Sequence, residues 1–409
     1  MIATDPHAIP HDTPPAHLDG LGPVVLGAIE PFDAQPMLGL PDAAKPAVIA
    51  VLAARHQGPV LVLAPTPTNA ADLVDALPLW LGERDRSRLL QFPARETAPY
   101  ERQKPAPDIV EARLSAIESL RQGSPIVVAD VDAAAQRTVA AVSAPLELCL
   151  GSTIRMADLV RSLDANGYER RRLVVEPSSF AVRGGIVDFW PPAEVEPVRV
   201  ELFGDDIDSI RRFDPLTQRS TQAVERVAVR PAREWSPGPA SEPLIEALLT
   251  AVDQDRRDEN DAAEATAEAA LLTLDLEHLR NGGPTARPDF WTQFLAPGTV
   301  FAHLGEDALV IVDEPHDVSS RAEERDRRAE DARAELEWEA RIPHGLPHPW
   351  LNCDELDAEI HRASHRVRSL SRLASGDQRL PFRPSPRLAG KLSQLFESLR
   401  ESRGRGAHV

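Results

Sequence analysis

Two segments of the chain carry residue types that could bind a nucleotide phosphate and its magnesium ion. Residues 39–46 (GLPDAAKP) have the frame of a P-loop, in which a lysine meets the phosphates. Residues 313–316 (DEPH) follow an apolar run and match a DExH box, whose Asp holds magnesium through water and whose Glu positions the attacking water. The candidate nucleotide-site residues are therefore Gly39, Lys45, Asp313 and Glu314.

The P-loop frame lacks two groups that phosphoryl transfer needs. A working P-loop has a second glycine before the lysine and a Ser or Thr after it, but this chain has Ala44 and Pro46. Pro46 also removes a backbone N–H from the phosphate cradle. We therefore expect a vestigial site with no catalytic residue, no cofactor and no metal. Lys45 is then a surface lysine in a helix's first turn, and the two acids are helix caps or solvated residues.

A second set of candidates lies on a small antiparallel sheet predicted between residues 167 and 220. Residues 198–203 (VRVELF) alternate, which places Arg199, Glu201 and Phe203 on one face, and Arg183 joins them from a neighbouring strand. Arginine offers carboxylates a planar fork, and an exposed aromatic ring can anchor a protein interface.

The same spacing has a second interpretation, which we favour on spacing alone. Arg199 and Glu201 can pair with cross-strand neighbours and stabilise the sheet by about 0.2–1 kcal/mol, while Phe203 belongs to the core.

Apolar runs indicate the elements that position these residues. Residues 59–64, 125–130 and 309–312 are typical of buried parallel strands, and residues 109–121 repeat apolar side chains at helical spacing. Strands that alternate with helices predict a parallel sheet covered on both faces. Because the two nucleotide-like segments flank the antiparallel region, one domain is expected to interrupt the other.

The predicted fold class is α/β: a degenerate P-loop (RecA-like) parallel-sheet domain interrupted by a small α+β domain. The expected boundaries follow from composition and turn signals. They are a disordered tail at 1–21, a first sheet segment at 22–150, the inserted domain at 151–234, a second sheet segment at 235–342, and a linker with the start of a truncated further domain at 343–409.

Composition excludes several classes of function. The net charge of −19 argues against broad binding to the nucleic-acid backbone, although arginines concentrate between residues 161 and 233. Cys149 and Cys353 provide neither a disulfide framework nor a zinc site, which fits a reducing cytoplasm. There is no apolar run long enough to span a membrane and no signal peptide, so we expect no membrane partner.

Three segments resemble one family. Residues 180–192 (FAVRGGIVDFWPP) and 198–220 (VRVELFGDDIDSIRRFDPLTQRS) resemble the UvrA-interaction domain shared by bacterial transcription-repair coupling factors and the excision-repair helicase UvrB. Residues 92–101 (FPARETAPYE) are similar to the family's FPxxETxPYE segment. The chain then passes from Lys104 directly toward the helix near Ile109, with no room for the aromatic-rich hairpin with which UvrB grips DNA. It is therefore more similar to the coupling factors.

The resemblance implies a site and a function. The UvrA contacts fall on Arg170, Arg183, Arg199, Glu201 and Phe203, while Ala181 stands where UvrB has a further arginine. The implied function is that of a non-catalytic amino-terminal module, which binds UvrA to recruit nucleotide excision repair to stalled transcription. It also implies a contribution to autoinhibition of the parent DNA translocase, because the same face is covered in the resting protein.

Two alternatives remain open: a UvrB-like DNA-dependent ATPase or helicase fragment, and a DNA-binding module that uses the arginine face. By the same resemblance, RNA polymerase, double-stranded DNA and ATP are partners of a full-length parent, through domains beyond this chain. The implied location is the bacterial cytoplasm, in association with the nucleoid.

Overall fold

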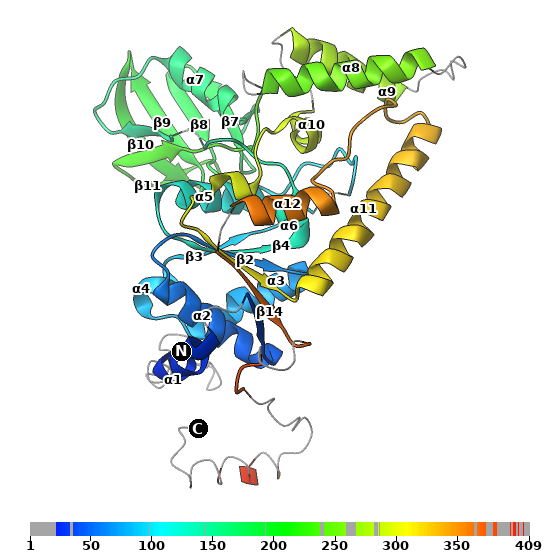
Figure 1. Ribbon diagram of the computed structural model, residues 1–409. Coiled ribbons are helices and arrows are strands. Elements are labelled where there is room, and N and C mark those ends of the chain that lie inside the picture. Colours follow the sequence, from blue (N-terminus) through cyan, green and yellow to red (C-terminus); the bar gives the residue numbers. More distant parts are fainter. Residues whose placement is uncertain are drawn as a thin grey trace.

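The predicted parallel sheet is present and contains six strands in the order β1-β14-β13-β2-β4-β3, all parallel (Figure 1). The computed structural model describes residues 22–32, 36–96, 98–142, 144–192, 194–237, 241–258, 267–281, 285, 287–363, 366–373, 379–382, 393, 396, 397, 400 and 404. The strands are β1 (Met37–Gly39), β2 (Val60–Ala64), β3 (Leu89–Phe92), β4 (Ile126–Asp130), β13 (Leu309–Asp313) and β14 (Arg366–Ser371). The predicted tail at 1–21 lies outside the described residues.

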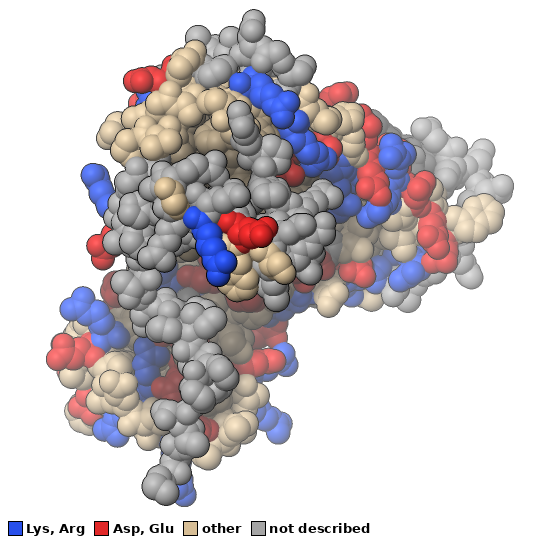
Figure 2. Space-filling view, turned by 90° about the horizontal axis from the view of Figure 1, so that it is seen from below, with Lys and Arg blue, Asp and Glu red and all other residues tan. Residues whose placement is uncertain are grey.

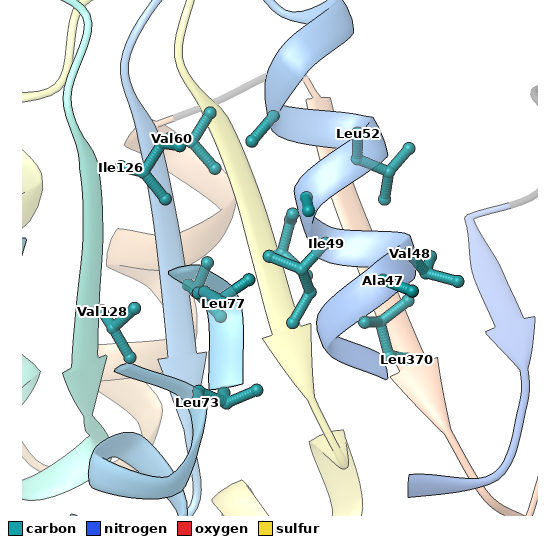
Figure 3. Close-up of a cluster of buried hydrophobic side chains, with 14 of the residues drawn as sticks. Ala47, Val48, Ile49, Leu52, Val60, Leu73, Leu77, Ile126, Val128 and Leu370 are labelled. Atoms are coloured by element: carbon teal, nitrogen blue, oxygen red, sulfur yellow. The ribbon is translucent and has the colours of Figure 1, made fainter. Parts of the chain in front are cut away.

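Both faces of this sheet are covered, which explains why its central strands are continuous apolar runs. Every residue of β2, β4 and β13 is buried, and successive residues contribute to opposite cores. One core contains side chains of α2 (Lys45–Arg55) and α3 (Pro67–Ala76), and Figure 3 shows those of α2 against the strands. The other contains side chains of α5 (Pro107–Gln122), α6 (Val131–Ala135), α11 (Pro315–Trp338) and α12 (Cys353–Ala363).

A second, antiparallel sheet lies above the first in Figure 1, in the order β11-β10-β9-β8-β7-β6. Only the β6–β7 pair at its edge is parallel. Its strands are β6 (Glu169–Arg170), β7 (Ser179–Arg183), β8 (Ile186–Phe189), β9 (Val198–Phe203), β10 (Asp206–Phe213) and β11 (Ser220–Ala223). Side chains of α7 (Met156–Ala165) pack on one face of this sheet. This arrangement confirms the α/β fold class with an inserted α+β domain.

Three helices form a third cluster beside the two sheets: α8 (Glu242–Asp258), α9 (Ala267–Arg280) and α10 (Pro288–Leu295). They bury Trp291 and Phe290 together with Tyr100, which comes from the first half of the chain. In the part of the chain that the structure describes, no helix has the length and apolar character to cross a bilayer.

The structure departs from the expected boundaries at two places. Residues 343–409 were expected to be a linker and the start of another domain, but β14 lies inside the parallel sheet between β1 and β13. Its sequence, RVRSLS, hides this position because only Leu370 and Ser371 are buried. At the other place, β5 (Leu146–Cys149) pairs with β12 (Arg226–Val229), so it belongs with the inserted domain.

Candidate protein-binding site

Four of the five candidate interface residues lie on the outer face of the antiparallel sheet, opposite α7. The strand register aligns Arg183 with Ile186 and Ile186 with Glu201 in one row, and it aligns Asp188 with Arg199 in the next. Phe203 ends β9 at the turn into β10, and its side chain is 81% exposed. The alternate residues of β9, Val198 and Val200, are buried in the core on the α7 side.

Arg199 is held inside the sheet. Its Nε and Nη2 donate to the two carboxylate oxygens of Asp188 at 2.7 and 2.9 Å, and its guanidinium carbon lies 4.8 Å from the ring centroid of Phe213. The hydrogen bonds from Arg199 to Asp188 raise the pKa of Arg199. This is the cross-strand pairing of the second interpretation. Arg199 therefore joins two strands of the sheet, and its guanidinium is already paired with a carboxylate.

Arg183, Glu201 and Phe203 are accessible to a partner. The Arg183 side chain is about half exposed, and its Nη2 donates to the backbone oxygen of Arg172 at 3.4 Å while lying 4.0 Å from Asp188 Oδ2. Glu201 is partly exposed, and Ile186 of β8 separates it from Arg183 in the same row. A guanidinium, a carboxylate and an aromatic ring therefore lie on one open face of the sheet.

Arg170 is not brought together with the other four. It lies on the short edge strand β6, in register with Phe180, whose side chain is buried in the core on the opposite face. It is exposed at the edge of the sheet.

Glycines allow two hairpins to meet at this site. Gly184 and Gly204 have φ of +60° and +64°, a backbone conformation that residues with a Cβ rarely adopt. Gly185 accepts a hydrogen bond from Leu202 N at 2.7 Å, and a Cβ on Gly185 would lie 2.7 Å from Leu202 O. This close approach places the turn that follows Arg183 next to the end of β9.

The nucleotide-like residues form a buried ionic cluster, not the surface site expected from the sequence. Lys45 is only 4% exposed, and its Nζ lies 2.7 Å from Asp42 Oδ1, 2.7 Å from Asp313 Oδ1 and 2.6 Å from Glu314 Oε1. Asp313 and Glu314 are also buried, so neither is a solvated residue. Gly39 ends β1, and its carbonyl accepts from Leu380 N at 2.7 Å.

The surroundings of this cluster hold Lys45 in place. Residues 42–44 form a 3-10 turn where a phosphate loop would wrap, and Glu314 also accepts from Arg372 N at 2.8 Å. Burial on its own lowers the pKa of Lys45, but hydrogen bonds and attraction from the three carboxylates raise it overall. Burial raises the pKa of Asp313, and Lys45 opposes that shift.

A cavity of about 350 Å³ lies beside the cluster, and Asp72 and Asp317 also line it. The ammonium of Lys45 already contacts three carboxylates, so the cluster presents net negative charge to any ligand that enters the cavity. Among the described residues, no group of His, Cys, Asp and Glu is arranged to hold a metal ion.

Comparison with known proteins identifies the antiparallel region. A family model described as "UvrB interaction domain" matches residues 146–235. The chain carries a UvrB interaction domain. This match begins at β5 and ends just after Glu234, so it covers the antiparallel sheet, α7 and the β5–β12 pair.

Homology extends well beyond this domain. The chain is 32% identical over 329 residues to the transcription-repair-coupling factor of Myxococcus xanthus, covering 73% of this chain and 26% of that protein. It is 33% identical over 221 residues to that of Bacillus subtilis, covering 53% and 18%. The UvrABC system protein B of Xylella fastidiosa is 29% identical over 314 residues, covering 69% and 46%. The chain therefore spans between about a fifth and a half of these relatives.

A buried ionic lock joins the UvrB interaction domain to the parallel-sheet domain. Glu234, where the chain leaves the inserted domain, accepts from Arg95 Nη1 at 2.7 Å and from Arg113 Nε at 2.9 and 3.0 Å. All three side chains are buried, and the Arg113 guanidinium carbon lies 4.0 Å from the ring centroid of Phe92. Burial lowers the pKa of Arg113 to about 10. Burial alone would raise the pKa of Glu234, but the two arginines hold it below its ordinary value.

Sequence reasoning missed this lock. One signal was available, because Arg113 occupies the apolar face of its helix, three residues after Val110 and next to Leu114, and all three are buried. A charged residue on such a face is almost never fully buried unless it is paired.

Basic and acidic side chains are interspersed on the face of the molecule shown in Figure 2, where many lie next to one another. This mixture differs from the single basic stripe that typically follows a nucleic-acid backbone.

Proposed function

We propose that this chain binds UvrA through its UvrB interaction domain and recruits nucleotide excision repair to stalled transcription. The family match and the homology to coupling factors and UvrB support a role in UvrA-linked excision repair. The observation that carries the proposal is the open surface formed by Arg183, Glu201 and Phe203 in that domain.

The chemistry of this surface suits a protein partner. Arg183 can donate two parallel hydrogen bonds to a carboxylate, and Glu201 can accept from a basic group. Phe203 can bury an aromatic ring on association, and a few such anchors dominate the energy of many interfaces. The Asp188–Arg199 pair in the neighbouring row joins β8 to β9, and this fixed arrangement lowers the ordering cost of binding.

Replacing Phe203 or Arg183 by alanine is expected to weaken binding of UvrA about tenfold or more, because each side chain would act as an interface anchor. Both side chains are exposed, so the free energy of unfolding should change by less than about 0.5 kcal/mol. Titration calorimetry with purified UvrA measures the affinity.

Trp338→Ala is a matched control for the aromatic ring, because Trp338 is 90% exposed but lies at the end of α11. It should bind UvrA as the wild type does. Equal weakening by Trp338→Ala, or wild-type affinity of both site variants, would contradict this assignment.

We also propose that this chain does not hydrolyse ATP. Three carboxylates already neutralise Lys45, and Ala44 and Pro46 stand where a glycine and a hydroxyl residue are needed. Equilibrium dialysis with Mg²⁺ and radiolabelled ATP should show no saturable binding up to about 1 mM, the upper end of typical substrate affinities. Saturable binding below that concentration would revive the UvrB-like ATPase alternative.

In a full-length parent, we propose that the Arg183–Phe203 surface is covered in the resting state, so that exposing it couples UvrA binding to release of the translocase. RNA polymerase, double-stranded DNA and ATP would bind to other domains of that parent. A test is whether the remainder of the parent, added in trans, competes with UvrA for this chain and loses that ability when Phe203 is replaced by alanine.

A further inference from the structure

A second small cluster lies under the outer face of the UvrB interaction domain, next to the Arg183–Phe203 surface. It consists of Val174, Ala181 and Phe213, with Trp190 packed against it. The loop before β7 and the loop after β10 meet here, because Gln218 Nε2 donates to Val174 O at 3.1 Å. The two loops are thus fixed to each other and to the sheet.

These loops expose aliphatic side chains to solvent. Leu173 and Val175 flank the buried Val174 and are 46% and 56% exposed, while Leu216 in the other loop is 90% exposed. Leu216 is held outward by a turn in which Asp214 Oδ1 accepts from the backbone N–H groups of Leu216 and Thr217, each at 2.8 Å. We call Leu173, Val175 and Leu216 the apolar ridge. Single exposed aliphatic residues are common, but several on adjoining ordered loops are typical of interaction sites.

The apolar ridge is continuous with the Arg183–Phe203 surface. Arg183 Nη2 donates to the carbonyl of Arg172, the residue before Leu173, and Arg199 Nη1 donates to the carbonyl of Gln218 at 3.4 Å. Phe203 lies at one end of β9, and the loop that carries Leu216 lies near the other end. The length of the strand between them is about 20 Å, at ~3.4 Å per residue. One partner of ordinary size covers about 800 Å² on each side, a patch roughly 30 Å across, so a single footprint can include both.

Unpaired arginines border the ridge. Arg172 and Arg219 are exposed, and neither forms an ion pair with another residue that the structure describes. With Arg183 they place three guanidinium groups near the aliphatic side chains, while the carboxylate of Glu176, next to Val175, already pairs with Arg171. A complementary surface would therefore present apolar side chains flanked by carboxylates.

We propose that the footprint of UvrA extends beyond Phe203 and Arg183 onto the apolar ridge, where an apolar segment flanked by acidic residues docks. This inference rests on the proposed function, because it assigns the ridge to the same partner. The ridge supplies a desolvated apolar part of the interface, and the arginines around it form the polar rim.

The test compares Leu216→Ser and Val175→Ser with the wild type in calorimetric titration against purified UvrA. Leu216→Ser is expected to weaken binding about tenfold or more, the effect of losing one buried aliphatic side chain. Its effect should persist at high salt, whereas that of Arg183→Ala should shrink because salt screens charge. Leu373→Ser is the matched control, since Leu373 is 70% exposed on the parallel-sheet domain, and it should leave affinity unchanged.

Each outcome has a different meaning. Weakening by both ridge variants, with unaltered melting temperatures and an unaffected control, supports the inference. If Arg183→Ala weakens binding while both ridge variants bind as the wild type does, the ridge lies outside the footprint and the inference fails, although the proposed function stands. If the folded wild-type chain does not bind UvrA, the proposed function and this inference both fail.

Discussion

Replacing Glu234 by alanine is expected to lower the free energy of unfolding by about 3–5 kcal/mol, the cost of removing one partner of a buried ion pair. Arg113 is fully buried, and Arg95 is nearly so, with Glu234 as the carboxylate between them. Without Glu234, two buried guanidinium groups lose the carboxylate that both of them contact. The loss should therefore exceed that of any exposed ion pair in the chain.

Urea denaturation of the wild type and the variant measures this difference. Glu176→Ala is the control, because Glu176 pairs with Arg171 at 3.2 Å on the surface of the same domain and should contribute less than about 1 kcal/mol. A Glu234→Ala loss no larger than that of the control would show that the lock does not stabilise the junction.

The Glu234 carboxylate and its two arginine partners predict how the free energy of unfolding depends on pH. The pKa of Glu234 is lower in the folded state than its ordinary value of 4.5, so folding favours the charged form. The stability that Glu234 contributes is complete above pH 4.5 and is lost as the pH falls through the folded-state pKa. The difference in stability between wild type and Glu234→Gln should therefore shrink as the pH is lowered below 4.5.

The lock also affects how rigidly the Arg183–Phe203 surface is held relative to the parallel sheet. Glu234 lies where the UvrB interaction domain rejoins the rest of the chain, and its arginine partners lie on α5 and after β3. A buried ionic contact has one favourable geometry, so it can fix the inserted domain against the sheet. This is the arrangement expected of a rigid recruitment surface, because preorganisation lowers the entropic cost of binding.

Much of the fold could be predicted because the central strands are buried on both sides. The apolar runs at β2, β4 and β13 have no other stable position in a soluble α/β domain, and their place on either side of the antiparallel region predicted the insertion. The strand β14 could not be found in this way. It carries arginine and serine at most positions, and only its pairing with β1 and β13 places it in the sheet.

The site could be predicted only as far as local periodicity reaches. Alternation along β9 correctly places Arg199, Glu201 and Phe203 on one face. The strand register, which aligns Asp188 with Arg199, was needed to show that Arg199 is already paired. Arg170 illustrates the same limit, because proximity in sequence did not reveal its place at the sheet edge.

Replacing Lys45 by methionine is expected to destabilise the protein by about 3–5 kcal/mol, since the change leaves buried carboxylates without a cation. Glu314 lies 269 residues from Lys45 along the chain, and Asp313 precedes it. This separation is why the sequence alone suggested a surface lysine. Lys104→Met is a matched control. Lys104 pairs with Glu169 at 2.9 Å, but both side chains are about 40% exposed, so its loss should cost less than about 1 kcal/mol.

The pH dependence separates a structural lysine from a phosphate-binding one. The pKa of Asp313 is already raised by burial, and removal of Lys45 removes the group that opposes this shift. A carboxyl with a raised folded-state pKa binds more protons when folded, so the variant should regain stability relative to the wild type as the pH falls. A lysine poised for phosphate would behave differently, because in the absence of nucleotide it has no carboxylate partner. Its removal would leave no buried negative charge unpaired, so the free energy of unfolding would be nearly unchanged. A Lys45→Met loss no greater than that of Lys104→Met would therefore contradict the buried cluster and return this lysine to the nucleotide-binding alternative.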